Sequence, residues 1–232
     1  MPSCLHMLLV ALLTTSGTAL ASPPTSDRPT LTDRATLVAA GELEAESGVS
    51  ISEGAVTIPT LLKYAPTGRT EARLGADLRH FGQGVTGLSA GAKISILHDS
   101  AIQVSTLLET ALPVGRADVW YGEALALVDI DADGVIISAN TGLEFSGVDG
   151  LGLAGVPLRG SIDAPLRKEL SIFGELSSVV RNGTFTNVLG DVGVRLRLTS
   201  IAHLDTFVGF EPASSTAFFG AGFTANLGRI GG

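Results

Sequence analysis

Residues 187–199 have the sequence NVLGDVGVRLRLT, in which polar and apolar side chains alternate almost one by one. The polar or small set is Asn187, Asp191, Gly193, Arg195, Arg197 and Thr199, and the apolar set is Val188, Val192, Val194, Leu196 and Leu198. A helix with 3.6 residues per turn would mix the two sets, whereas a strand separates them onto opposite faces. The segment therefore predicts a β-strand with one polar face and one apolar face.

The same alternation recurs along the chain. It is regular in residues 41–52, 69–79, 85–96, 102–112 and 216–226, and less regular in residues 56–64, 117–128, 135–145, 151–162, 169–181 and 201–211. With residues 187–199 this makes twelve candidate strands, each nine to thirteen residues long. Strands of soluble sheets have about five or six residues, whereas about 9–11 residues cross a bilayer at a tilt.

Short turn sequences separate the candidate strands, among them Asp133-Gly134 and Asn182-Gly183. Short turns favour an up-and-down meander, and an even number of strands allows the sheet to close. Closure leaves no unpaired backbone edge, which lipid could not tolerate. The sequence thus predicts an all-β chain that forms a single antiparallel transmembrane β-barrel of about twelve strands.

The composition agrees with this fold. Only 16% of the 232 residues are charged and 29 are glycine, and the mean hydropathy is +0.39. After the first 21 residues no apolar run approaches the ~18–20 residues of a membrane helix. In a transmembrane barrel the hydrophobicity is spread over every second residue. The net charge of −8 argues against a nucleic-acid partner, because binding phosphates requires clustered lysine and arginine.

The N-terminus resembles an export signal. Residues 8–13 (LLVALL) form a short apolar core, and Ala19-Leu20-Ala21 matches a cleavage site. We therefore expect a signal peptide over residues 1–21, an extended leader over residues 22–40 and an outer-membrane barrel over residues 41–232. The one cysteine, Cys4, lies in the removed segment, so we expect the mature chain to lack disulfides, cysteine-ligated metal and a cysteine nucleophile.

The polar face of the strands supplies the candidate site. The predicted lumen-lining residues are Glu42, Glu44, Glu46, Glu71, Arg73, Asp77, Arg79, Lys93, Glu109, Asp191, Arg195 and Arg197, and the same face carries Glu144, Glu175, Asp205 and Glu211. Two interpretations stay open. The arginines could guide polar or anionic solutes through the lumen, or ion pairs could fill a narrow barrel.

Other motifs favour structural roles. Residues 129–134 (DIDADG) match the first half of a calcium loop, but Asn140 stands where the loop needs glutamate, so a hairpin turn is favoured. His203 and Asp205 share a face but lack a nucleophile elbow. Residues 150–155 match the Gly-x-Gly-x-x-Gly pattern, but the chain lacks the βαβ units in which this pattern binds dinucleotides, so a glycine-rich strand is favoured. We therefore expect no catalytic residue, no metal site and no cofactor, and no enzymatic activity.

Several segments are similar to one known family. They are residues 27–32 (DRPTLT), 41–44 (GELE), 59–64 (PTLLKY), 67–75 (TGRTEARLG), 105–115, which end in LPVG, and 139–143 (ANTGL). In this order they resemble the bacterial outer-membrane barrels named for the MetA pathway of phenol degradation, over roughly residues 27–226. The resemblance implies an outer-membrane location and passage of small compounds, aromatic ones among them.

We thus expect an outer-membrane channel or transporter for small aromatic or hydrophobic compounds. Its expected partners are outer-membrane lipid, a small-molecule solute and the outer-membrane assembly machinery. One alternative is a soluble periplasmic β-sandwich or small barrel with a binding or structural role, because alternation alone does not say which face points inward. A second alternative is a lipid hydrolase embedded in the barrel.

Overall fold

The computed structural model describes residues 22–27, 31–79, 85–112, 114, 119–147 and 152–230, without the side chains of Arg79 and Thr86. The expected signal peptide, residues 1–21, lies outside the described residues. Among the residues that are described, no helix is long and apolar enough to cross a membrane.

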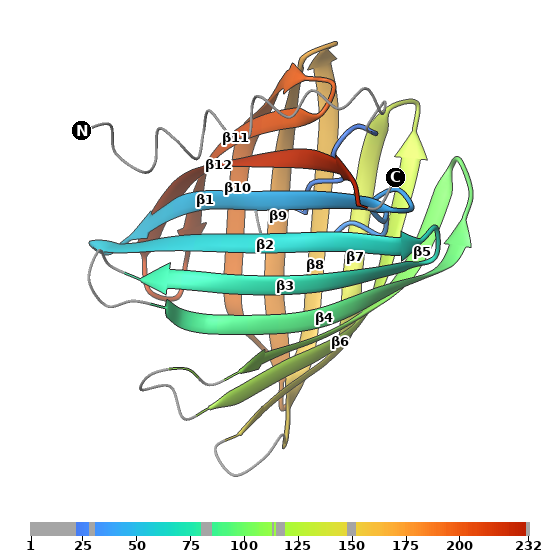
Figure 1. The fold of residues 1–232 in the computed structure, drawn as a ribbon. Coiled ribbons are helices and arrows are strands. Elements are labelled where there is room, and N and C mark those ends of the chain that lie inside the picture. Colours follow the sequence, from blue (N-terminus) through green and yellow to red (C-terminus); the bar gives the residue numbers. More distant parts are fainter. Residues whose placement is uncertain are drawn as a thin grey trace, which may run out of the picture.

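Twelve antiparallel strands form one closed barrel, which confirms the predicted fold (Figure 1). The strands are β1 (Glu42–Ser52), β2 (Ala55–Thr67), β3 (Thr70–Arg79), β4 (Val85–His98), β5 (Ile102–Leu112), β6 (Trp120–Ala132), β7 (Val135–Gly147), β8 (Gly152–Arg167), β9 (Leu170–Arg181), β10 (Thr184–Thr199), β11 (Ala202–Glu211) and β12 (Thr216–Arg229). Each strand pairs with its neighbours in sequence, and β1 pairs with β12 from Glu42 opposite Arg229 to Ser52 opposite Phe218. The sheet therefore has no free edge.

The two ends of the barrel differ. The end that holds the start of β1 and the end of β12 has connections of two or three residues, such as residues 168–169 between β8 and β9. At the opposite end some connections are longer, including those between β3 and β4 and between β5 and β6. We call these the terminal end and the long-loop end.

The connection between β6 and β7 is a tight turn at the terminal end. Asp133 and Gly134 both have positive φ, 55° and 87°, as a two-residue hairpin turn requires. The carboxylate of Asp131 accepts the backbone N–H of Gly134 at 2.8 Å. The DIDADG motif thus forms the hairpin turn that the sequence favoured.

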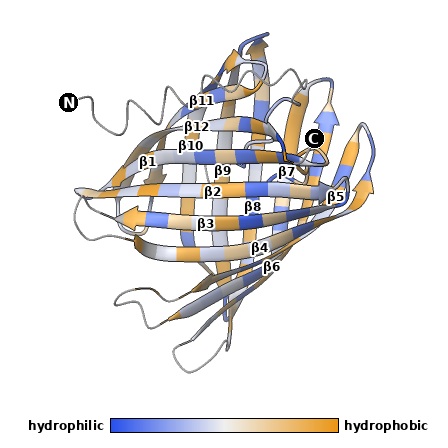
Figure 2. Ribbon diagram, viewed as in Figure 1, coloured by the Kyte–Doolittle hydropathy of each residue, from blue (hydrophilic) through white to orange (hydrophobic). Residues whose placement is uncertain are grey.

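Apolar side chains cover the outside of the barrel, and charged side chains line the inside. Hydrophobic and hydrophilic residues alternate along β1, β2 and β3 in Figure 2. Leu74, Leu176 and Val192 expose 62%, 61% and 61% of their surface, whereas Glu44, Lys63 and Lys93 expose none. Soluble monomers rarely carry a continuous apolar exterior of this kind. The structure therefore does not favour the soluble alternative, which needs the aliphatic faces packed inward.

We expect Leu176→Arg to prevent stable assembly in lipid. Leu176 lies in the middle of β9 on the apolar exterior, and an arginine at the bilayer midplane costs about 2–4 kcal/mol in transmembrane barrels. The matched control is Leu166→Arg, because Leu166 is also exposed but lies next to the β8–β9 turn, where the cost falls to about 0–1 kcal/mol. Heat-modifiable migration in gels after folding into vesicles measures assembly. Equal assembly of both variants would contradict a lipid-facing exterior.

Candidate functional site

The described part of the leader, residues 22–27 and 31–40, lies inside the barrel. Its described residues form no helix or strand, yet they hydrogen-bond or pair with side chains of β1 to β9 and of β12. These strands make up most of the wall of the closed barrel. A segment that contacts side chains from all of them must therefore run through the lumen. The sequence predicted an extended leader but not its position inside the barrel.

Three glutamates of β1 hold the first half of the leader. Glu42 accepts the backbone N–H of Ser22 at 3.2 Å. Glu44 accepts that of Thr25 at 2.8 Å, and Glu46 accepts that of Asp27 at 2.9 Å. Every second residue of a strand points to the same face, about 6.6 Å apart. The spacing of these carboxylates therefore matches an extended chain that runs alongside β1 in the same direction.

The second half of the leader crosses to β9, β7 and β6 and then returns to β3. There too, backbone N–H groups of the leader donate to side-chain oxygens of the barrel. The bonds run from Thr32 to Glu175 (3.1 Å), from Asp33 to Asn140 (2.9 Å), from Ala35 to Asp129 (3.0 Å) and from Val38 to Glu71 (2.9 Å). Polar groups of an irregular segment need partners when they are buried. The inner wall supplies these partners.

A buried group of charges surrounds Asp27 of the leader. Its carboxylate lies 3.2 Å from Nζ of Lys63, 3.3 Å from Nη1 of Arg73 and 3.4 Å from Nζ of Lys93. Burial acts to raise the pKa of Asp27, but the three cations outweigh it and hold that pKa well below its usual range. Asp27 is therefore the anionic centre that fixes the leader against β2, β3 and β4.

The cations of this group also neutralise carboxylates of the wall. Nζ of Lys63 lies 2.6 Å from Glu44 and also pairs with Glu46. Nη2 of Arg73 lies 2.9 Å from Asp33 of the leader, and its Nε lies 3.6 Å from Glu109. Removing one charged side chain from such a buried set leaves its partner's charge without compensation, which lowers the stability of the fold.

A second group of polar side chains projects from β6, β7, β8 and β9. Arg159 pairs with Glu123 and lies 3.5 Å from Asp33. The hydroxyl of Tyr121 donates to Glu144 at 2.8 Å, and Glu144 lies 3.0 Å from Arg181. Asp33 connects this group to the one around Asp27, because it contacts both Arg73 and Arg159.

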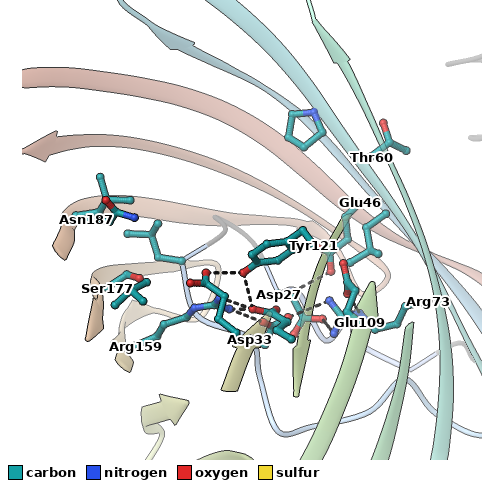
Figure 3. Close-up of a pocket in the computed structure, with 17 residues that line it drawn as sticks. Asp27, Asp33, Glu46, Thr60, Arg73, Glu109, Tyr121, Arg159, Ser177 and Asn187 are labelled. Atoms are coloured by element: carbon teal, nitrogen blue, oxygen red, sulfur yellow. Dashed lines mark hydrogen bonds and ion pairs between the residues drawn. The ribbon is translucent and has the colours of Figure 1, made fainter. Parts of the chain in front are cut away.

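Among the described residues, two of the cavities beside the leader are large. The larger, about 450 Å³, is lined by Asp27, Asp33, Arg73, Glu109, Tyr121 and Arg159 among others (Figure 3). The smaller, about 240 Å³, has Pro24 and Arg34 of the leader in its wall and reaches the β8–β9 turn at the terminal end. The leader thus contributes to the walls of both cavities.

The predicted lumen-lining residues fall into three sets. Those that are buried are Glu42, Glu44, Glu46, Glu71, Arg73, Lys93 and Asp191; those that are half-buried are Glu109 and Arg195; and those that are exposed are Asp77 and Arg197. The side chain of Arg79 lies outside the described part of the chain. Arg73 lines the larger cavity, whereas Arg195, which pairs with Asp163, and Arg197 line the smaller one, so these three described arginines do not share one cavity.

Several residues of the site were not among the sequence candidates. They are Asp27, Asp33, Lys63, Tyr121, Glu123, Asp129 and Arg159. Glu123 and Asp129 are an even number of residues apart in β6, so strict alternation could have placed them on one face. No signal in the sequence could have placed Asp27 and Asp33, because neither residue belongs to a strand.

Comparison with known proteins identifies the fold. In solved structures the chain is similar to the KdgM porin (TM-score 0.64, 12% identity, 78% of this chain and 98% of that one). It is also similar to the NanC porin (TM-score 0.60, 9% identity, 79% and 98%). The COG4313 outer-membrane channel from Pseudomonas putida F1 aligns with a TM-score of 0.53 at 11% identity, over 87% and 99% of the two chains. The chain therefore has the fold of outer-membrane porins and channels.

No model of a known protein family matches the sequence, and no curated protein matches it either. The resemblance to the phenol-pathway barrels is therefore not confirmed. At these identities the structural similarity defines the fold, and the solute of the protein has to be inferred from its own residues.

We expect Lys63→Met to destabilise the barrel by about 3–5 kcal/mol, because it leaves buried carboxylates without their cation. Urea unfolding followed by the fluorescence of Trp120, the one tryptophan, measures the effect. Lys168→Met, in the exposed β8–β9 turn, is the control and should change stability by less than about 0.5 kcal/mol. Equal stability of the two variants would show that the Lys63 contacts do not stabilise the fold.

We expect Asp27→Asn to loosen the leader, because three cations then lose their shared carboxylate. A nitroxide label on Pro23→Cys, an exposed leader position, reports its mobility. The pKa of Asp27 is lowered from an ordinary value of 3.8. The contribution of the ionised carboxylate to stability is therefore fully present above pH 3.8 and is lost as the pH falls further. The label should therefore stay immobile from neutral pH to about pH 5 in the parent and be mobile throughout in Asp27→Asn. Asp99→Asn, in an exposed turn, should behave as the parent.

Proposed function

We propose that the protein is a channel of the bacterial outer membrane that passes small solutes. The observation that carries the proposal is a closed barrel with an aliphatic exterior, a charged interior and a cavity of about 450 Å³ within the lumen. Such an exterior suits acyl chains, and such an interior suits water and polar solutes. The fold of porins and channels supports the same function.

In this proposal residues 1–21 export the chain and are removed, and the outer-membrane assembly machinery inserts the barrel. Bacterial barrels of this kind have short periplasmic turns and longer extracellular loops. The terminal end would then face the periplasm, and the long-loop end would face the outside of the cell.

Small aromatic compounds are the solutes that the family resemblance suggests, and the larger cavity has suitable walls for them. Pro59, Leu61, Val179 and Leu189 line it together with the ring of Tyr121. Binding sites for small molecules combine such apolar walls with a few polar groups, in cavities of about 300–1,000 Å³. The expectation that the protein is not an enzyme stays a prediction.

The leader would set the size of the passage. It fills part of the lumen and is held there by both walls of the barrel. A solute that crosses the barrel would have to pass beside the leader or displace part of it. The proposal therefore predicts slow permeation by the intact chain.

We expect deletion of residues 22–38 to raise permeation by about tenfold or more. The deletion leaves an open lumen lined by charged side chains, through which water and small solutes pass freely. Swelling of liposomes in arabinose and in the larger sugar stachyose measures permeation. The intact chain should pass arabinose slowly and stachyose hardly at all, and the shortened chain should pass both. If neither chain permits swelling, although gels show that both have folded, the channel function is wrong.

A further inference from the structure

We propose that the larger cavity recognises small organic cations, with Glu109, Glu123 and Glu144 facing the cationic group and the Tyr121 ring packing against the carbon skeleton. The inference rests on the proposed channel function and specifies its solute class. It differs from the sequence interpretation in which arginines guide anions.

Acidic side chains outnumber basic ones around this cavity. Among the described residues, its wall holds six carboxylates and two guanidinium groups: Asp27, Asp33, Glu46, Glu109, Glu123 and Glu144 against Arg73 and Arg159. Figure 3 shows most of these groups converging from the leader and from several strands. A solute in the cavity therefore meets mainly negative charge.

Both arginines already form ion pairs with carboxylates. Arg73 lies within 4.0 Å of Asp27, Asp33, Glu71 and Glu109. Arg159 pairs with Glu123 and with Asp33. A guanidinium surrounded in this way has little positive potential left for an anionic solute.

Apart from the pairs Arg34–Asp129 and Arg195–Asp163, the described ion pairs join into one network in which acidic groups outnumber basic ones. Lys63, Arg73, Lys93, Arg159 and Arg181 are its cations, and Asp27, Asp33, Glu44, Glu46, Glu71, Glu109, Glu123 and Glu144 are its anions. Five cations cannot neutralise eight carboxylates. Six of the eight acidic groups line the cavity, where a cationic solute can balance this surplus.

The position of Tyr121 gives the cavity an aromatic surface beside this charge. Its hydroxyl donates to Glu144 at 2.8 Å and its oxygen also lies 3.3 Å from a carboxylate oxygen of Glu123, which places the ring next to both groups. Aromatic faces attract organic cations, and carboxylates bind an ammonium group by charge-assisted hydrogen bonds. An aromatic amine satisfies both features.

The smaller cavity has the opposite charge balance. Five lysine or arginine side chains and two carboxylates line it in the described part of the chain, with Arg167 and Lys168 at the terminal end. The acidic surplus is therefore a local property of the larger cavity, and the smaller cavity provides a control position for testing it.

Calorimetric titration of the detergent-purified barrel with two probes of similar shape tests the proposal. Phenethylamine is cationic at neutral pH and 3-phenylpropanoate is anionic. We expect the amine to bind about tenfold or more tightly than the carboxylate. Glu109→Gln should weaken amine binding by about fivefold. This variant should fold, because Glu109 is half-buried and Arg73 keeps its other carboxylates.

The matched control is Glu169→Gln, which removes the same charge from the smaller cavity and should leave amine binding unchanged. Equal binding of the two probes, no binding of the amine, or equal weakening by both variants would overturn the proposal. Liposome swelling separates this outcome from failure of the channel function. A barrel that passes arabinose but does not prefer the amine is a channel without cation recognition, and a barrel that binds the amine but passes no sugar is not a channel.

Discussion

The need to give buried carboxylates hydrogen-bond donors organises the interior of this barrel. Closing the sheet turns one face of twelve strands inward, and that face carries acidic residues that cannot lose their hydration without compensation. The leader provides this compensation with its backbone N–H groups, which are otherwise unpaired because the leader has no secondary structure. Barrel wall and leader therefore stabilise each other, and neither buried surface would be satisfied alone.

The same contacts divide the lumen by charge. Asp27 and Asp33 add two carboxylates to the barrel's own glutamates, so the cavity beside them becomes more acidic. Arg34 joins three arginines and one lysine of the wall, so the smaller cavity becomes more basic. Among the described residues, the wall alone already places four carboxylates and two arginines around the larger cavity and four cations and two carboxylates around the smaller one, so the leader increases an existing separation.

The strand pattern and the site were predictable to different degrees. Every candidate strand was found, because a two-residue period is a local property of the sequence and register follows from short turns. The alternation also indicated Glu42, Glu44 and Glu46, which are buried in the structure. The alternation did not indicate Lys63 and Arg159 as lumen-lining residues, because their segments alternate less regularly. Asp33 and Asp129 form contacts between residues about a hundred positions apart, which no local pattern records.

The sequence by itself determined a twelve-stranded sheet with one apolar and one polar face, since side-chain direction in a strand depends only on whether positions are odd or even. Tertiary structure decided which face points inward, where the leader lies and which charges meet. These depend on closure of β1 against β12, which brings groups from both ends of the chain together: Ser22 and Glu42 both bond to Asn226 only because the first and last strands are neighbours.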